Sequence, residues 1–310
     1  MRKTTKGLIK INGAVMFWGV SFVSIKIAVA VIPPMTLGAL RFALALLFLY
    51  GIKKWKAPEE KLQKGDGPYL VGAGLVGVTA YFFFENHGVA LIPASEASII
   101  VAAIPVFSML AEQIASALFS QKTKPLHLLQ WFGAALSMLG VWCITLPSLS
   151  GAMETPGMSD PRGYLFMLGA VVSWVLYAFL TRPLFSRHSN IFIVFWQSLF
   201  GFLGFLPFTL SEQAQWSSIP ALVWAHVGYL GIFCSALGYL FYVEGLETLG
   251  VGTSSVFINL IPVVTLGTAF ISLGERLTPI QLVGTALVLG GIYLATLPKT
   301  HHFHRPPDSD

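Results

Sequence analysis

The amino-acid sequence predicts an all-α membrane protein of ten transmembrane helices, built as two inverted five-helix repeats. Three observations support this prediction: the composition, the spacing of the apolar runs and an internal repeat. Of the 310 residues, 55% are hydrophobic and 11% are charged, and the mean hydropathy is +0.72. Because a soluble domain carries about 25% charged residues, the composition excludes a soluble globule, a disordered chain and a nucleic-acid-binding protein.

Ten apolar runs are bounded by charged residues, proline or glycine. Their limits lie near 9–31, 35–52, 68–91, 94–118, 127–146, 163–182, 191–210, 219–244, 252–273 and 279–298. A membrane-spanning helix needs about 20 apolar residues, and lipid cannot satisfy the backbone polar groups of a non-helical segment. Each run is therefore predicted to be one transmembrane helix.

The first run follows four basic residues within the first ten positions, a pattern that also begins a signal peptide. We interpret it as a permanent span, because it is long enough to cross a bilayer and contains Lys26. In addition, its segment 13–18 recurs as segment 169–174. A cleaved peptide would not form part of a structural repeat.

The basic residues are distributed unevenly between the two sides of the predicted bundle. With the N-terminus in the cytoplasm, 15 of the 19 lysine and arginine residues fall on the cytoplasmic side and only Arg162 and Arg276 fall outside. Lys26 and Arg41 lie inside spans. Cytoplasmic loops are enriched in basic residues, so both termini are predicted to be cytoplasmic.

The two halves of the chain match each other at several positions. Gly88 corresponds to Gly245, segment 98–106 to 255–263, and segment 133–147 to 284–298. Five spans in each half force the second copy to enter the membrane from the opposite side, as in inverted-repeat transporters. The predicted parts are a first repeat at 1–147, an extracytoplasmic linker at 148–162, a second repeat at 163–298 and a polar cytoplasmic tail at 299–310.

These motifs resemble the EamA-type transporters of the drug/metabolite transporter superfamily over nearly the whole chain. The residues that carry the resemblance are Trp18-Gly19, Phe22, Lys26, Arg41, the stretch Ala94–Pro105, Pro262, Gly274-Glu275-Arg276-Leu277, Gln281 and Gly284. The resemblance implies a ten-helix carrier of small metabolites in the bacterial inner membrane, most often an exporter and in several cases one of amino acids. The first half departs from the pattern, because Lys122-Thr123-Lys124-Pro125 replaces the Gly-Glu-Arg turn.

Charged side chains inside the spans are the first candidates for a transport site. Such a charge costs about 2.5–3.5 kcal/mol on insertion scales, so it faces the bundle interior or a wet cavity. Glu85 has the most site-like setting, because Asn86 and His87 follow it and the aromatic run 81–84 precedes it. Glu96 also lies within the fourth span.

Lys26 and Arg41 are candidates to bind a substrate carboxylate, and Glu85 is a candidate to bind an ammonium group. The alternative is a group of salt bridges that joins the first four spans, or a Lys26 side chain that extends to the interface. Buried carboxyl groups exchange protons near neutral pH, so Glu85 and Glu112 are candidates for coupling export to proton entry. The alternative for Glu112 is a structural hydrogen bond within the bundle.

Aromatic and proline residues complete the predicted site. Matched or clustered side chains are expected to form an aromatic-walled pocket at the centre of the bundle; they are Trp18, Trp174, Tyr177, Tyr239, Tyr242 and Asn259. The alternative is ordinary packing or anchoring at the interface. Pro105 and Pro262 occupy matched positions in the fourth and ninth spans and predict helix kinks.

The sequence therefore predicts a secondary transporter that exports a small metabolite, such as an amino acid or a related zwitterion. The run Gly72–Gly77 fits a dinucleotide-binding pattern, but it has no preceding strand and is better explained by close helix packing. We expect no metal, no cofactor and no enzymatic activity. The rival interpretations are an importer, an exporter of lipophilic cations, a non-transporting membrane subunit, and an intramembrane lipid enzyme that would use Glu85, His87 and Ser95. The expected partners are the substrate, the lipid bilayer and protons, while the sequence leaves the oligomeric state open.

Overall fold

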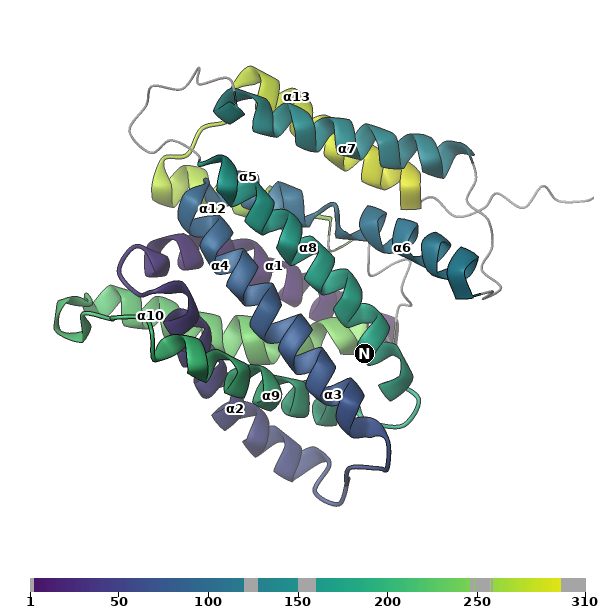
Figure 1. The fold of residues 1–310 in the computed structure, drawn as a ribbon, viewed down its shortest axis with the longest axis vertical. Coiled ribbons are helices and arrows are strands. Elements are labelled where there is room, and N and C mark those ends of the chain that lie inside the picture. Colours follow the sequence, from purple (N-terminus) through teal and green to yellow (C-terminus); the bar gives the residue numbers. More distant parts are fainter. Residues whose placement is uncertain are drawn as a thin grey trace, which may run out of the picture.

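The computed structural model describes residues 3–119, 128–149, 160–245, 248, 257 and 259–296. All regular structure in these residues is helical, as Figure 1 shows. The predicted linker 148–162 lies largely outside the described residues, and the predicted tail 299–310 lies wholly outside them.

Eight helical segments are long and apolar enough to cross a membrane, and they coincide with the first eight predicted spans. They are Thr5–Val29, Pro34–Lys56, Asp66–Leu91, Ala94–Ala117, Leu128–Leu146, Pro161–Leu184, Asn190–Thr209 and Ala221–Gly245. The last two predicted runs coincide with shorter apolar helices, Ile261–Leu273 and Pro279–Ala295, in the part of the chain that the structure describes. The chain is therefore a multi-pass membrane protein.

The helices follow one another in a simple order along the chain. The first half contains α1 (Lys3–Val29), α2 (Pro34–Lys56), α3 (Asp66–Gly74), η1 (Leu75–Ala80), α4 (Tyr81–Leu91), α5 (Ala94–Val101), α6 (Ile104–Phe119) and α7 (Leu128–Leu149). The second half contains α8 (Pro161–Thr181), η2 (Arg182–Leu184), α9 (Asn190–Thr209), η3 (Trp216–Ser218), α10 (Ala221–Tyr229), η4 (Leu230–Gly238), α12 (Ile261–Leu273) and α13 (Pro279–Thr296).

Two spans contain a wide π-helical turn near the middle of their length. The turn η1 separates α3 from α4, and the turn η4 follows α10. These are the third and eighth predicted spans, which correspond in the repeat. Such π turns often occur at functional sites, and here each one ends directly before a tyrosine, Tyr81 or Tyr239.

The fourth span is interrupted near its middle. Helix α5 ends at Val101, Ala102 and Ala103 form a turn, and α6 begins at Ile104. Pro105 is the second residue of α6, and Pro262 is likewise the second residue of α12. A proline in the first turn of a helix sacrifices no hydrogen bond, so each proline begins a new helix after a break.

Helices from the two halves pack against each other throughout the bundle. Helix α7 lies along α13 (Figure 1), α2 lies against α9, and α4 lies against α8. The α7–α13 contact depends on glycines: a Cβ added at Gly284 would lie 2.7 Å from the carbonyl oxygen of Gly140. Small residues allow such close approach between membrane helices.

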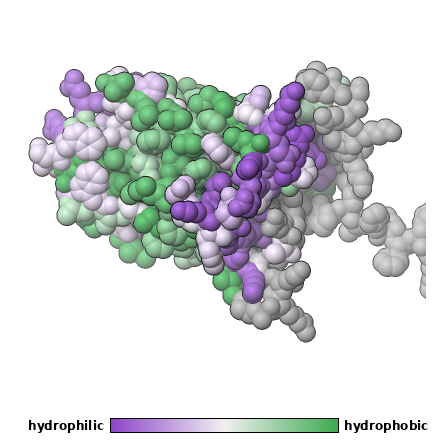
Figure 2. Space-filling view, turned by 90° about the horizontal axis from the view of Figure 1, so that it is seen from below, coloured by the Kyte–Doolittle hydropathy of each residue, from purple (hydrophilic) through white to green (hydrophobic). Residues whose placement is uncertain are grey.

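The outer surface has the polarity expected of a protein in lipid. Figure 2 shows an apolar band, with hydrophilic residues gathered toward the ends of the molecule. Large exposed side chains such as Leu47 (75% exposed) and Leu222 (67% exposed) belong to this apolar surface. At one end, the Glu244 carboxylate forms ion pairs with Lys10 of α1 and Lys56 of α2.

Candidate substrate cavity

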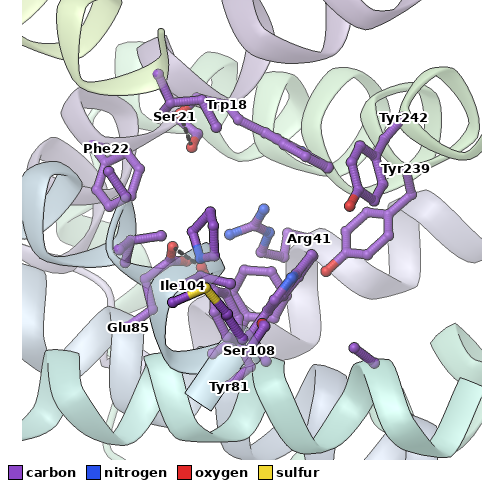
Figure 3. Close-up of a pocket in the computed structure, with 18 of the residues that line it drawn as sticks. Trp18, Ser21, Phe22, Arg41, Tyr81, Glu85, Ile104, Ser108, Tyr239 and Tyr242 are labelled. Atoms are coloured by element: carbon purple, nitrogen blue, oxygen red, sulfur yellow. Dashed lines mark hydrogen bonds between the residues drawn. The ribbon is translucent and has the colours of Figure 1, made fainter. Parts of the chain in front are cut away.

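A cavity of about 380 Å³ lies inside the bundle, between the helices of the two halves (Figure 3). Its walls come from α1, α2, the third and fourth spans, α8, the eighth span and α12. The lining residues are Trp18, Ser21, Phe22, Arg41, Tyr81, Phe82, Glu85, Val101, Ala102, Ile104, Pro105, Ser108, Met109, Glu112, Trp174, Ala178, Tyr239, Tyr242 and Ile261. A cavity of this size accommodates a small metabolite.

One wall of the cavity is a continuous group of aromatic rings from both halves. The Trp18 ring lies 6.2 Å from the Trp174 ring, 5.6 Å from the Tyr239 ring and 5.3 Å from the Tyr242 ring. The Trp174 and Tyr239 rings are 5.9 Å apart. Edge contacts of this kind are favourable, so the rings support one another and form a stable surface for an apolar or cationic group.

The π turn η4 positions two of the cavity side chains. The Trp18 indole Nε1 donates to the carbonyl oxygen of Cys234 at 3.1 Å. The Arg41 Nε donates to the Ser235 hydroxyl at 2.9 Å. Both acceptors belong to η4, so the irregular turn supplies polar contacts that lie in the centre of an otherwise apolar bundle.

Arg41 is a buried cation that forms no salt bridge among the described residues. Its side chain is 2% exposed, and its guanidinium carbon lies 4.2 Å from the centre of the Phe82 ring. The Nη1 atom is buried and has no hydrogen-bond partner in the part of the chain that the structure describes. In Figure 3 the guanidinium points into the middle of the cavity. A buried charge in this state strongly favours an anionic ligand.

Glu85 supplies the opposite charge in the same cavity. It is 4% exposed, and its carboxylate accepts a hydrogen bond from the Tyr81 hydroxyl at 2.9 Å. The ion pairs found among the described residues do not include one between Glu85 and Arg41. The two charges therefore lie apart in one enclosed space.

The structure brings six of the eleven predicted binding residues to this cavity. They are Trp18, Arg41, Glu85, Trp174, Tyr239 and Tyr242. The Tyr239 hydroxyl, like the Arg41 Nη1 atom, is buried without a partner among the described residues.

Lys26 lies in the last turn of α1, outside the set of lining residues. Its ammonium group donates to the carbonyl oxygens of Val89 at 2.9 Å, Ala90 at 3.2 Å and Ile92 at 2.9 Å. These are the last carbonyls of α4 and of the turn that follows it. Lys26 therefore caps a helix C-terminus, which a positive charge stabilises.

The other four predicted residues are also outside the set of lining residues. Asn86 donates to the Pro34 carbonyl oxygen at 2.8 Å, and the His87 ring contacts the Phe83 carbonyl oxygen through Nδ1 at 2.7 Å. The Tyr177 hydroxyl donates to the Gln197 side chain at 3.1 Å. Asn259 is partly buried in the turn before α12, with its side-chain oxygen unpartnered among the described residues.

The two proton-coupling candidates occupy different depths of the cavity. Glu85 is enclosed, whereas Glu112 on α6 lines the cavity and is exposed. The cavity thus extends from Glu85 along the second half of the fourth span. Pro105 lines this path, and Pro262 is buried at the start of α12.

Several lining residues were not predicted from the sequence. Tyr81 is the most informative of them, because its hydroxyl contacts Glu85. The four-residue spacing of Tyr81 and Glu85 in a helix was a usable signal, since side chains at that spacing share a face. Ser21, Phe22 and Ser108 carry no comparable signal in the sequence.

The described residues contain no group of three or more His, Cys, Asp or Glu side chains arranged to hold a metal ion. A membrane bundle of two similar halves, enclosing a small cavity with both charges and an aromatic wall, is the architecture of a small-solute transporter. The chain belongs to the EamA-like transporter family, whose model matches residues 5–146 and again residues 161–297. The family unit is thus present twice.

Individual relatives agree with this assignment. An uncharacterized transporter of Archaeoglobus fulgidus is 29% identical over 286 residues, which cover 90% of this chain and 95% of the relative. A protein of Salmonella typhimurium named as a probable amino-acid metabolite efflux pump is 29% identical over 294 residues, covering 90% of this chain and 91% of the relative. A solved structure titled only as the crystal structure of a protein has the same fold, with a TM-score of 0.63 at 21% identity, over 94% of this chain and 98% of that chain.

Proposed function

We propose that this protein is a secondary transporter that exports amino acids or related zwitterions across the bacterial inner membrane by alternating access. The observation that carries the proposal is the presence of Arg41 and Glu85 in one buried cavity, as opposite charges that form no direct salt bridge with each other. Burial of an unpaired charge is costly, so this cavity favours a ligand that brings both countercharges. The amino-acid efflux named for the Salmonella relative supports the same class of substrate.

The bound zwitterion is oriented by the two charges. Its carboxylate accepts hydrogen bonds from the Arg41 guanidinium, and its ammonium group lies beside the Glu85 carboxylate. The remainder of the substrate lies against the rings of Trp18 and Trp174, which suit an apolar or aromatic side chain. Hydrogen bonds to charged groups contribute about 1.5–3 kcal/mol each, so two such contacts give useful selectivity without very tight binding.

Two reciprocal contacts support an inverted arrangement of the repeats. Glu212, in the loop after α9, accepts from the backbone N–H groups of Met35 and Thr36 at the start of α2, at 2.9 and 2.6 Å. Glu60, in the loop after α2, accepts from the backbone N–H of Ser189 just before α9, at 2.8 Å. Each helix is thus capped by the loop that follows its repeat partner. Two helices related in this way run in opposite directions, so the repeats have opposite orientations in a ten-span bundle.

The cavity extends toward the end of the bundle that the basic residues assign to the cytoplasm. Its lining residue Tyr242 lies two positions before Glu244, which forms ion pairs with Lys10 and Lys56. Basic residues gather on the cytoplasmic side of membrane proteins, which places both termini there as well. A cavity that extends to the cytoplasm takes up its substrate from the cell, as an exporter requires.

The proposal is tested by reconstituting the protein in liposomes and measuring uptake of labelled amino acids, with and without an imposed pH gradient. Saturable uptake that excess unlabelled compound inhibits is expected for zwitterions. The matched decarboxylated amine and the matched carboxylic acid that lacks the amino group are expected to compete poorly, because each satisfies only one charge. Equal competition by either analogue would refute zwitterion recognition. A rate that follows the pH gradient identifies proton coupling, for which Glu85 and Glu112 are the candidates.

A further inference from the structure

The carboxylate of Glu275 joins the loop after α12 to the start of α5. Glu275 lies in the loop between α12 and α13, directly after Gly274, whose φ of +68° gives the chain a left-handed turn. Its carboxylate accepts from the backbone N–H groups of Ala94 and Ser95, at 2.9 and 3.0 Å, and from the Ser95 hydroxyl at 2.6 Å. A carboxylate at this position caps the start of α5.

Further contacts join the start of α5 to the rest of the bundle at the same end. Lys26 of α1 binds the carbonyls of the turn that leads into α5. Glu96 of α5 accepts from the Gln281 side chain of α13 at 2.6 Å and from the Tyr164 hydroxyl of α8. The loop after α12 and helices α13 and α8 therefore all contact the first turn of α5, and α1 contacts the segment just before it.

Glu212 makes almost the same set of contacts with α2. It accepts from the Met35 and Thr36 backbone N–H groups and, at 2.7 Å, from the Thr36 hydroxyl. In the repeat, α2 corresponds to α9, where Glu60 accepts from the backbone N–H and the hydroxyl of Ser189. Loop carboxylates therefore bind the start of each helix of the α2–α9 pair, so the pair is held at both of its ends. We use the word clasp for each such set of hydrogen bonds between a loop carboxylate and the start of a helix.

The clasps at the two ends of α2 and α9 differ from the Glu275 clasp in their relation to the cavity. The Glu60–Ser189 clasp is formed at the end of the bundle toward which the cavity extends, so its presence does not close that end. None of the described residues of α9 lines the cavity, and α2, which carries the cavity residue Arg41, runs without a break from Pro34 to Lys56. Helix α5, by contrast, leads from Ser95 to the cavity residue Val101 and ends at the break before α6.

The clasp on α5 also has no acidic counterpart in the corresponding loop of the first repeat. Glu275 follows the ninth span, so its counterpart belongs to the loop after the fourth span. Residues 120–127 of that loop contain two lysines and no aspartate or glutamate. The loop after the ninth span therefore has a carboxylate, Glu275, for which residues 120–127 of the loop after the fourth span offer no equivalent.

We propose that the Glu275–Ser95 clasp is the latch of the extracytoplasmic gate, and that the Glu212–Thr36 clasp is a static support. Release of substrate to the outside requires the Glu275 carboxylate to leave the start of α5, so that α5 swings about the break at Ala102. The contacts of Glu212 persist through the transport cycle. This inference rests on the proposed alternating-access mechanism, but its first test needs no substrate.

The test measures access to the cavity from the extracytoplasmic side. Cys143 and Cys234 are replaced by alanine, and Ser21, a cavity residue one turn beyond Trp18, is replaced by cysteine. The rate of modification by a membrane-impermeant thiosulfonate is measured in right-side-out vesicles. E275Q is expected to raise this rate about tenfold or more, equivalent to a shift of about 1.4 kcal/mol toward the open state. The glutamine amide presents an N–H group to one of the backbone donors, so it cannot replace the carboxylate.

E212Q is the matched control, because it removes a carboxylate with the same kinds of partner. It is expected to change the modification rate less than about twofold on the same population-shift reasoning. An E275Q rate equal to that of the parent, or an equal increase in E212Q, would overturn the proposal. If a glutamine variant does not fold, S95A and T36A repeat the comparison by removing only one hydroxyl from each clasp. A modification rate that rises in S95A alone supports the latch, and equal modification rates in S95A and T36A refute it.

A second experiment tests the role of the latch in transport. In the cysteine-free background, one variant carries S95C and E275C, and a second variant carries T36C and E212C. The two cysteines of each variant are then cross-linked. Cross-linking the first pair is expected to stop transport until reductant is added, whereas the second pair continues to transport. If no zwitterion is transported by the parent protein, the proposed function fails, while the modification rates still decide the gate independently. Equal inhibition by both cross-links refutes the distinction between latch and support.

Discussion

The substitution R41Q separates a substrate-binding role for Arg41 from a structural role. The guanidinium is buried, donates one hydrogen bond to Ser235 at 2.9 Å, and has no ion-pair partner among the described residues. Loss of a charged hydrogen bond to a substrate carboxylate costs about 1.5–3 kcal/mol, which corresponds to roughly a 10- to 150-fold weaker affinity. Removal of a buried charge that forms no salt bridge does not break an ion pair and is tolerated by the fold.

The assay measures substrate affinity and thermal stability on the same purified R41Q protein. We expect affinity for a zwitterion to fall by the factor above, while the Tm of the substrate-free protein stays unchanged or rises. The methyl ester of the same amino acid is expected to lose little affinity, because it brings no carboxylate. S235A is the companion variant: it frees the guanidinium without removing the charge, so a smaller loss is expected. A large fall in Tm without a preferential loss of carboxylate binding would refute the assignment.

Three further predictions concern pH and packing. Burial raises the pKa of the Glu60 carboxyl, but hydrogen bonds from Ser189 and His188, together with the charge of His188, lower it below the usual 4.5. The stability that this clasp contributes is therefore present above about pH 4.5 and is lost as the pH falls through the lower folded-state pKa. In acid, the Tm of the wild-type protein is expected to fall more steeply than the Tm of E60Q. Parallel curves of Tm against pH for the two proteins would contradict this prediction. In G284V, even the Cβ of the new side chain would lie 2.7 Å from the Gly140 carbonyl oxygen. The substitution is expected to destabilise the bundle by about 1–3 kcal/mol, measured by chemical unfolding in detergent. G290V is the control, because a Cβ at Gly290 meets no atom within 4 Å. E85Q is expected to abolish the response of transport to a pH gradient, and an unchanged response would remove Glu85 as the coupling group.

The spans were predictable because lipid imposes a local requirement on the chain. A segment that crosses the membrane must be apolar over about 20 residues and must satisfy its own backbone. Both conditions can be read from consecutive residues, so the first eight predicted runs coincide with long apolar helices. The double match to the family unit confirms that the chain contains two copies.

The side of a helix that faces the cavity was less predictable from composition. Glu85, Asn86 and His87 are consecutive, and successive residues in a helix point about 100° apart. Glu85 lines the cavity, whereas Asn86 and His87 turn to the carbonyl oxygens of Pro34 and Phe83. Tyr81, four residues before Glu85, shares its face and contacts it.

The sequence by itself determined the membrane class, the repeated unit and the pool of intramembrane charges, because each depends on local composition or on comparison of one half with the other. The tertiary structure decided which charges share the cavity. Lys26 and Arg41 are similar in the sequence, yet Lys26 caps α4 and Arg41 enters the cavity. It also decided the partners of Glu275, which lie about 180 residues away in the chain. Contacts at such separation depend on how the helices pack together, and no local pattern in the sequence encodes them.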